Sequence, residues 1–286
     1  MGELLTTKDL TLKILNKYVP EDFLNERLDY FDILEESVNN FPSSNWDAHI
    51  ESISSLAWNP RIFFIDNIHY VSYSYFKKYN RILKNKYYKE KSFYDLSKEF
   101  SENDIFPTRK YSRSRYDTIQ ECLTILKYID TDKPFTILDI GGGYGRLAEY
   151  FLKSPNCIYY NADTFALSSI TAEWYLSHVV DQTKIKFLKD KDYYNKQLNF
   201  ITTSQIESYI DNDINFDFII NVHSLDEMNI ETIVKILELI DKNKNNYAYI
   251  KNHFITYNLG TNNAQIGTWD GIIPKNWTIL ENNYCS

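Results

Sequence analysis

Glycine is concentrated in one short segment of this chain. Four of the eight glycines, Gly141, Gly142, Gly143 and Gly145, fall within five residues. Because glycine weakens regular structure by about 0.5–1 kcal/mol per residue, such a cluster needs a conformational or steric reason. An apolar run rich in branched side chains, Phe135–Ile140, precedes the cluster, and a helical pattern follows it. This strand, turn and helix predict the first crossing of a parallel α/β sheet.

Strand and helix patterns alternate through the rest of the C-terminal part. Further apolar runs that predict strands lie at 157–162, 185–188, 200–203, 216–222, 247–251 and 277–280. Helical periodicity places helices at 144–153, 165–180 and 229–240. This alternation predicts a Rossmann-like α/β fold, with a mostly parallel sheet of seven strands covered by helices on both faces.

The first 115 residues have a different pattern, with helices and aromatic loops. Apolar residues recur at helical spacing from Leu24 to Val38 and predict one helix after Pro20. Shorter helices are expected near 44–58 and 92–100. Because helical periodicity resumes at residue 116, we place a boundary near residue 115. It separates a helical, aromatic-rich acceptor-side or lid region (1–115) from an α/β domain (116–286).

The charge balance and composition limit the classes of partner. The chain has 39 acidic and 31 basic side chains, a formal charge of −8, and 16% aromatic residues. Nucleic-acid binding needs clustered Lys and Arg, so a small-molecule acceptor is favoured. The sequence has no 18-residue apolar run or secretion leader, and its three cysteines have no metal spacing. We therefore expect a cytoplasmic protein with free thiols and no membrane span, and leave a homo-oligomer open.

The glycine turn predicts a ligand at the carboxyl ends of the strands, where doubly wound sheets bind nucleotides. Asp139, before the first glycine, would oppose a pyrophosphate but could hold a cationic ammonium group. Asp163, after the second strand, is placed to hold ribose hydroxyls. The spacing Gly143-x-Gly145-x-x-Ala148 also satisfies the dinucleotide fingerprint. An NAD(P)-binding oxidoreductase is therefore an alternative to a protein that binds S-adenosylmethionine.

A second group of polar residues follows the strand at 216–222. Asn221 and His223 lie at its end, on the predicted ligand edge of the sheet. His223 is a candidate general base for a hydroxyl, because histidine has a pKa near about 6.5. Asp226 and Glu227 are further catalytic candidates and could hold a divalent ion. Their favoured role is to complement the start of the next helix, so no metal site is predicted.

These two motifs resemble those of a known enzyme class. Asp139 to Gly145 resembles the first motif of class I methyltransferases, an acidic residue followed by Gly-x-Gly-x-Gly. With the pattern Asn-x-His-Ser-x-x-Glu-Met at 221–228, the chain resembles the bacterial sugar O-methyltransferases of that class over roughly residues 105–255. The resemblance implies S-adenosylmethionine as cofactor, with Asp139 near its methionine moiety, Gly141 and Gly143 in close approach, and Asp163 at its ribose.

The resemblance leaves part of the site to position alone. The family usually has Asp-Leu-Pro after the second strand, where this chain has Asp163, Thr164 and Phe165. Ser204 and Gln205 follow a candidate strand and are predicted to contact the adenine. The residues predicted to contact the acceptor are Tyr111, Arg113, Arg115 and Tyr144. The arginines suit a phosphate or carboxylate on an activated sugar.

The resulting hypothesis is an S-adenosylmethionine-dependent O-methyltransferase that acts on a hydroxyl of a sugar or glycosylated metabolite. Two alternatives stand beside the oxidoreductase. The acceptor could be another small molecule or a peptide. The chain could also be a non-catalytic, cofactor-binding partner protein.

Overall fold

The computed structural model describes residues 7–16, 19–40, 113–178, 180–190, 196–225, 228–243, 247–252, 256–257, 264–265 and 273–281. Its α-helices are α1 (Thr7–Leu15), α2 (Glu21–Asn25), α3 (Tyr30–Asn40), α8 (Arg113–Ile125), α9 (Arg146–Phe151), α10 (Ala166–Leu176), α11 (Ile206–Asp211) and α12 (Ile230–Lys242). Its 3-10 helices are η1 (Gln182–Lys184) and η2 (Thr203–Gln205). Its strands are β1 (Phe135–Ile140), β2 (Cys157–Ala162), β3 (Ile185–Lys186), β4 (Leu198–Ile201), β5 (Phe218–Val222), β6 (Tyr247–Lys251), β7 (Thr256–Tyr257) and β8 (Ala264–Gln265).

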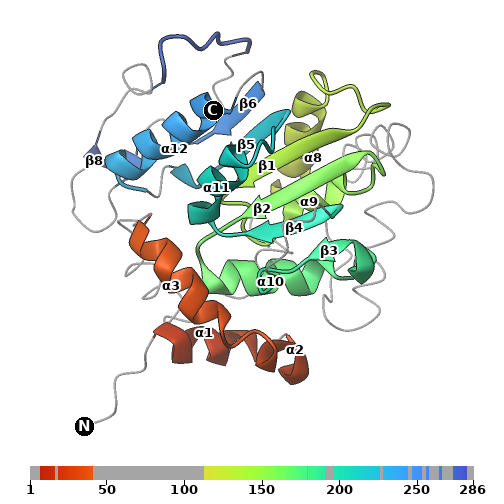
Figure 1. The fold of residues 1–286 in the computed structure, drawn as a ribbon, viewed down its shortest axis with the longest axis vertical. Coiled ribbons are helices and arrows are strands. Elements are labelled where there is room, and N and C mark those ends of the chain that lie inside the picture. Colours follow the sequence, from red (N-terminus) through yellow and green to blue (C-terminus); the bar gives the residue numbers. More distant parts are fainter. Residues whose placement is uncertain are drawn as a thin grey trace.

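A parallel sheet forms the centre of the molecule (Figure 1). Its strand order is β3-β4-β2-β1-β5-β6, and β7 and β8 form a separate antiparallel pair. The chain moves from β1 outward through β2 and then returns to the other side of β1 at β5. A topological switch point therefore lies between β1 and β5. The Rossmann-like α/β prediction is confirmed, although the described residues give this sheet six strands and not seven.

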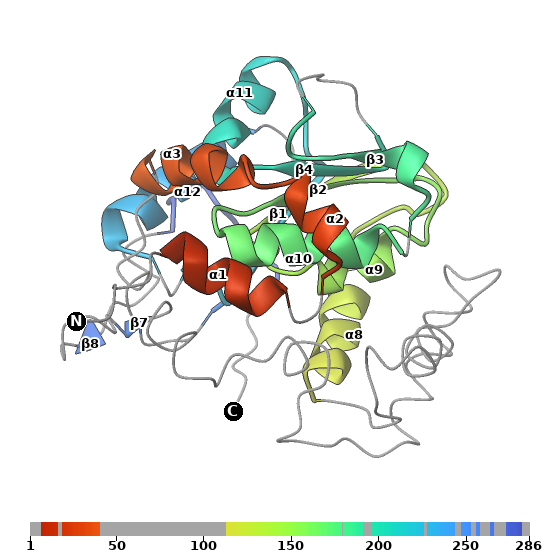
Figure 2. The same ribbon diagram turned by 90° about the horizontal axis from the view of Figure 1, so that it is seen from below.

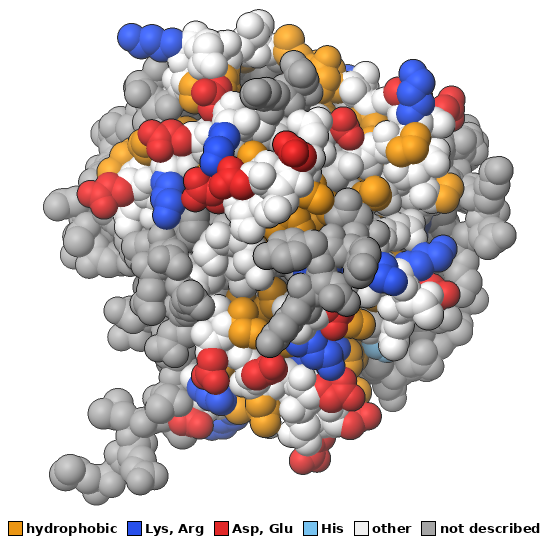
Figure 3. Space-filling model, in the orientation of Figure 1, with side chains coloured by type: hydrophobic (Ala, Val, Ile, Leu, Met, Phe, Trp, Pro, Cys, Tyr) orange, Lys and Arg blue, Asp and Glu red, His pale blue; other side chains and the backbone are white. Residues whose placement is uncertain are grey.

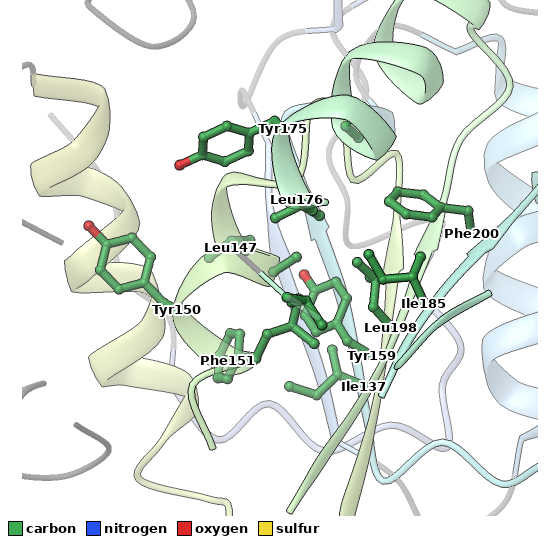
Figure 4. Packing of buried hydrophobic residues seen from close by; sticks show 14 of the residues in the cluster. Ile137, Leu147, Tyr150, Phe151, Tyr159, Tyr175, Leu176, Ile185, Leu198 and Phe200 are labelled. Atoms are coloured by element: carbon green, nitrogen blue, oxygen red, sulfur yellow. The ribbon is translucent and has the colours of Figure 1, made fainter. Parts of the chain in front are cut away.

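Side chains alternate between the two faces of the sheet because successive residues of a strand point to opposite sides. Ile137 and Tyr159 pack in one core with α8, α9 and α10, whereas Leu138 and Tyr160 pack in a second core with α11 and α12. Figure 2 shows these two helical layers on opposite sides of the sheet. Figure 4 shows Ile137 and Tyr159 beside the apolar side chains of α9 and α10.

The predicted helix between Leu24 and Val38 is two helices. Residues 26–29 form a turn between α2 and α3, and Leu28, expected on the apolar face, is 38% exposed. The turn allows Arg27 and Tyr30 to bond the buried carboxylate of Glu173 on α10. A contact made 146 residues away thus outweighs the local helical pattern. The helices expected near 44–58 and 92–100 lie outside the described residues.

The segment at 277–280, predicted as a final strand, is irregular, so this prediction is wrong. The indole Nε1 of Trp277 donates to Asp241 Oδ1 at 2.9 Å, and Asn276 Nδ2 donates to the same oxygen at 2.8 Å. These side-chain bonds attach the segment to α12 instead of to a sheet ladder.

The surface of the described residues mixes both signs of charge on the face drawn in Figure 3, where acidic and basic side chains are interspersed. None of the helices within the described ranges is long and apolar enough to cross a membrane.

Candidate functional site

The glycine turn begins where β1 ends and lies against the end of β2. The backbone N–H groups of Gly141 and Gly142 donate to the carbonyl oxygen of Ala162, at 2.8 Å and 3.3 Å. Gly141, Gly143 and Gly145 have φ values of 70°, 55° and 83°. This left-handed conformation strains any residue with a side chain, which accounts for three of the four clustered glycines.

The space around these glycines differs from one to the next. A Cβ atom on Gly141 would lie 2.0 Å from Ser224 Oγ, and one on Gly145 would lie 2.5 Å from Leu176 Cδ1. Gly141 and Gly145 are therefore required for packing. A Cβ on Gly143 would meet no described atom within 4 Å. The backbone of Gly143 thus faces open space at the switch point, as a ligand-approach residue should.

Asp163 lies beside this open backbone, directly after β2. Its carboxylate is 8% exposed, and Oδ2 accepts from Gly143 N at 2.9 Å while Oδ1 accepts from Phe165 N at 2.8 Å. These bonds join the turn to the start of α10. Each carboxylate oxygen has a second lone pair, so Asp163 can also accept from a ligand hydroxyl.

Asp139 lies behind the turn, on the side of the sheet that α8 and α9 cover. It is 2% exposed, and Tyr159 Oη donates to its Oδ2 at 2.6 Å. Burial raises the pKa of Asp139 from 3.8 to about 7, although the Tyr159 hydroxyl and the nearby Arg146 oppose the shift. A buried carboxyl that titrates near neutral pH is typical of a binding or catalytic site.

Asn161 on β2 was not predicted as a site residue. Its side chain is 1% exposed, and its Nδ2 donates to the Gly143 carbonyl at 3.5 Å. Its Oδ1 has no hydrogen-bond partner among the described residues. A Cβ on Gly142 would lie 2.1 Å from Asn161 Oδ1 and 3.1 Å from Asp139 Oδ2, so Gly142 keeps space for these two oxygens.

Sequence reasoning also missed a buried ionic cluster beside the turn. Glu121 on α8 is 1% exposed and accepts from Lys251 Nζ at 2.7 Å through Oε1. Its Oε2 lies 3.6 Å from Arg146 Nη2. Lys251 ends β6 and Arg146 begins α9, so Glu121 contacts elements on both sides of the switch point. Because 130 residues separate Glu121 from Lys251, no local spacing in the sequence indicates this pair.

Asn221 joins the ends of β1 and β5. Its side chain is fully buried, and Nδ2 donates to the Ile140 carbonyl and to Ser224 Oγ, both at 2.8 Å. Its Oδ1 accepts from Leu225 N at 3.3 Å and from Asn252 Nδ2 at 2.9 Å. These bonds give Asn221 a bracing role. The predicted contact of Asn221 with the cofactor stays a prediction.

His223 follows β5 in an unusual backbone conformation. It is exposed, its φ is 56°, and its N–H donates to the Lys251 carbonyl at 2.8 Å. Side chains in this left-handed region are uncommon, and they cluster at functional sites. The next residue, Ser224, fills the space where Gly141 lacks a side chain. His223 is therefore adjacent in the chain to a direct contact with the glycine turn.

The adenine candidates lie after β4, in η2. Gln205 Oε1 accepts from Thr202 N at 2.9 Å, and Ser204 N donates to Ser37 Oγ of α3 at 3.3 Å. The N-terminal helices thus contact the edge of the sheet on its β4 side. The predicted adenine contacts stay predictions.

The remaining candidates are placed less completely. Arg113 and Arg115 lie in the first turn of α8, which begins three residues before its predicted start, and their side chains are not described. Tyr144 is half-buried and packs against the core. Tyr111, Asp226 and Glu227 lie outside the described residues. Within the described ranges, no group of three or more His, Cys, Asp or Glu residues could hold a metal ion.

Comparisons with known proteins give weak, partial matches. No family model and no curated protein matches this sequence. Among similar solved structures, the mitomycin 7-O-methyltransferase MmcR is 18% identical, with 56% of this chain and 42% of that chain covered and a TM-score of 0.34. The plantazolicin methyltransferase BpumL, in complex with SAH, is 18% identical, with 62% and 61% covered and a TM-score of 0.32.

A third similar structure is magnesium protoporphyrin IX methyltransferase (ChlM) from Synechocystis PCC 6803, with bound SAM. It is 11% identical, with 66% of this chain and 74% of that chain covered and a TM-score of 0.32. This chain spans less than two thirds of the length of MmcR and BpumL. Because these superpositions are partial and the TM-scores low, function must be inferred from the geometry of the site itself.

Proposed function

We propose that this chain is an S-adenosylmethionine-dependent methyltransferase. The observation that carries the proposal is the open backbone of Gly143 at the switch point, between the carboxylates of Asp163 and Asp139. A carboxylate behind the turn disfavours a pyrophosphate and favours a ligand with a cationic group. This charge pattern separates the proposal from the NAD(P) alternative, which shares the glycine spacing.

The residues around the turn fit a zwitterionic amino acid. Asp139 and the unpaired Oδ1 of Asn161 offer acceptors for an ammonium group. Arg146 and Lys251, whose side chains are 25% and 21% exposed, offer cations for a carboxylate. Asp163 is assigned to the ribose hydroxyls. When bound, the cofactor supplies an electrophilic methyl group on a positively charged sulfur.

The acceptor is proposed to be a hydroxyl of a sugar or glycosylated metabolite, with His223 as general base. A sugar hydroxyl is a poor nucleophile until its proton is removed, and a neutral imidazole can accept that proton near pH 7. The exposed position of His223 after β5 and the motif at 221–228 support this role. Residues 1–115 are proposed to contribute to the acceptor side.

Transfer of a labelled methyl group tests the proposal. The protein is incubated with methyl-labelled S-adenosylmethionine and extracts rich in sugar nucleotides and glycans, and products that gain label are identified by mass spectrometry. We expect a labelled sugar, and a loss of about 10²–10⁴-fold in rate for His223→Ala. Labelling of a different small molecule or a peptide would overturn the sugar assignment. Cofactor binding without any transfer would favour the non-catalytic alternative.

A further inference from the structure

Glu121 connects the two parts of the proposed site, and the proposed function gives it no role of its own. We propose that Glu121 is a positioning residue that couples the glycine turn, where the cofactor is assigned, to the turn that carries His223. The inference rests on the proposed function and adds a residue to it. It is argued from the contacts of Glu121 on each side of the switch point.

On the β6 side, Glu121 holds Lys251. The Lys251 Nζ donates to the buried Oε1 at 2.7 Å, which fixes the last residue of β6. The carbonyl oxygen of that same residue accepts from His223 N at 2.8 Å. His223 has a φ of 56°, a conformation that persists only when its surroundings impose it. The Glu121–Lys251 pair thus stabilises the bond that holds the His223 turn.

On the other side, Glu121 faces Arg146, the first residue after Gly145. The distance from Oε2 to Arg146 Nη2 is 3.6 Å, and Oε2 has no hydrogen bond within the described residues. The pair therefore attracts through charge without a closed hydrogen bond. A shift of Arg146 or of the turn before it changes the electrostatic balance at Glu121, and through it the hold on Lys251.

Glu173 supplies a matched control in the same chain. It is also a fully buried carboxylate paired with a cation, Arg27, at 2.7 Å. Its partners come from α2, α3 and the segment after β3, and none of them contacts the glycine turn or His223 in the printed bonds. Neutralising either carboxylate leaves a buried cation without its charge partner and destabilises the fold. Only Glu121 is expected to alter the site.

The experiment compares Glu121→Gln with Glu173→Gln in the full chain labelled with ¹³C-histidine. The ring signal of His223 is assigned with His223→Gln, and affinity for S-adenosylhomocysteine is measured by calorimetry. We expect both variants to unfold at lower urea concentration. Only Glu121→Gln should shift the His223 signal and weaken S-adenosylhomocysteine binding by about fivefold or more.

Two further variants separate the arms of the coupling. Lys251→Met should shift the His223 signal as Glu121→Gln does, and it replaces Glu121→Gln if that variant fails to fold. An unchanged His223 signal in Glu121→Gln or Lys251→Met, or the same shift in Glu173→Gln, would overturn the proposal. If the wild-type protein does not bind S-adenosylhomocysteine, the proposed function fails, while the His223 signal still tests the coupling itself.

Discussion

Two buried carboxylate clusters in this molecule differ in how completely their hydrogen bonds are satisfied. Around Glu173, Arg27 Nε donates at 2.7 Å, Tyr30 Oη at 2.9 Å and Leu188 N at 2.8 Å. Every contact closes within the protein, and the cluster joins the N-terminal helices to α10. A satisfied buried network of this kind specifies one packing arrangement.

The cluster behind the glycine turn is incomplete. Glu121 Oε2 and Asn161 Oδ1 have no hydrogen-bond partner in the described part of the chain. The pKa of Asp139 is raised to about 7 by burial. Buried acceptors without donors are costly, so their presence beside the open backbone of Gly143 calls for a ligand that brings donors. The comparison teaches that the satisfied cluster maintains the fold and the incomplete one marks the site.

The largest expected effect is the loss of the satisfied cluster. Glu173→Gln leaves the 3%-exposed Arg27 without its charge partner, and we expect a loss of about 3–5 kcal/mol in the free energy of unfolding. Urea denaturation measures this loss. Affinity for S-adenosylhomocysteine of the remaining folded protein should be unchanged. A stability change below about 1 kcal/mol would remove the distinction between the two clusters.

The glycines sharpen the comparison within the turn. Gly141→Ala places a Cβ 2.0 Å from Ser224 Oγ in addition to backbone strain, so we expect a loss of about 2–3 kcal/mol in stability. Gly143→Ala adds a Cβ in open space and should cost about 1–2 kcal/mol through its φ of 55° alone.

Paired stability and calorimetric measurements on the two variants test this order. Gly143→Ala should lose more affinity for S-adenosylhomocysteine than its modest destabilisation implies, because the added methyl group enters the ligand space. The double variant Gly141→Ala with Ser224→Gly should recover stability. If Gly143→Ala binds as tightly as wild type, the open backbone is not a ligand contact.

A pH profile tests the buried carboxyl of the incomplete cluster. The pKa of Asp139 is about 7 when folded and 3.8 ordinarily, so the folded protein binds this proton more tightly than the unfolded chain. Its contribution to stability is complete below pH about 4 and is lost as the pH rises to about 7, by at most about 1.4 kcal/mol per unit. Asp139→Asn should flatten this fall, as followed by urea unfolding. Parallel profiles for the two proteins would contradict the raised pKa.

The smallest expected effect on stability concerns the unpaired acceptor. Asn161→Ala removes an unsatisfied buried oxygen together with one long hydrogen bond, so stability should change by no more than about 1 kcal/mol. Affinity for S-adenosylhomocysteine should still fall, by about tenfold. A variant that loses stability but retains affinity would make Asn161 a structural residue like Glu173.

The local parts of the fold could be predicted from the sequence. The bounds of β1 and β2 agree with the predicted strands, and the N-cap of α12 follows from Asn229, whose Oδ1 accepts from Thr232 N at 2.8 Å. The glycine turn is local too, because its φ values need residues without side chains. Short-range patterns carry enough information for elements that depend on neighbouring residues.

Features set by distant contacts could not be predicted in this way. The break between α2 and α3 depends on Glu173, and the irregular tail depends on the bonds between Trp277 and Asp241. In the site, Glu121 and Asn161 have no motif, because their importance arises only when β2, β6 and α8 come together. Asp139 was predicted from its position beside the glycines, but its pKa reflects burial, which a local pattern does not report.

Calorimetric titration of the wild-type protein with S-adenosylhomocysteine, with NADH as the parallel ligand, tests the central claim most directly. The incomplete cluster and open turn predict saturable binding of one S-adenosylhomocysteine per chain, and no binding of NADH. Binding of NADH in its place, or no heat with S-adenosylhomocysteine under conditions where the protein is folded, would contradict the claim.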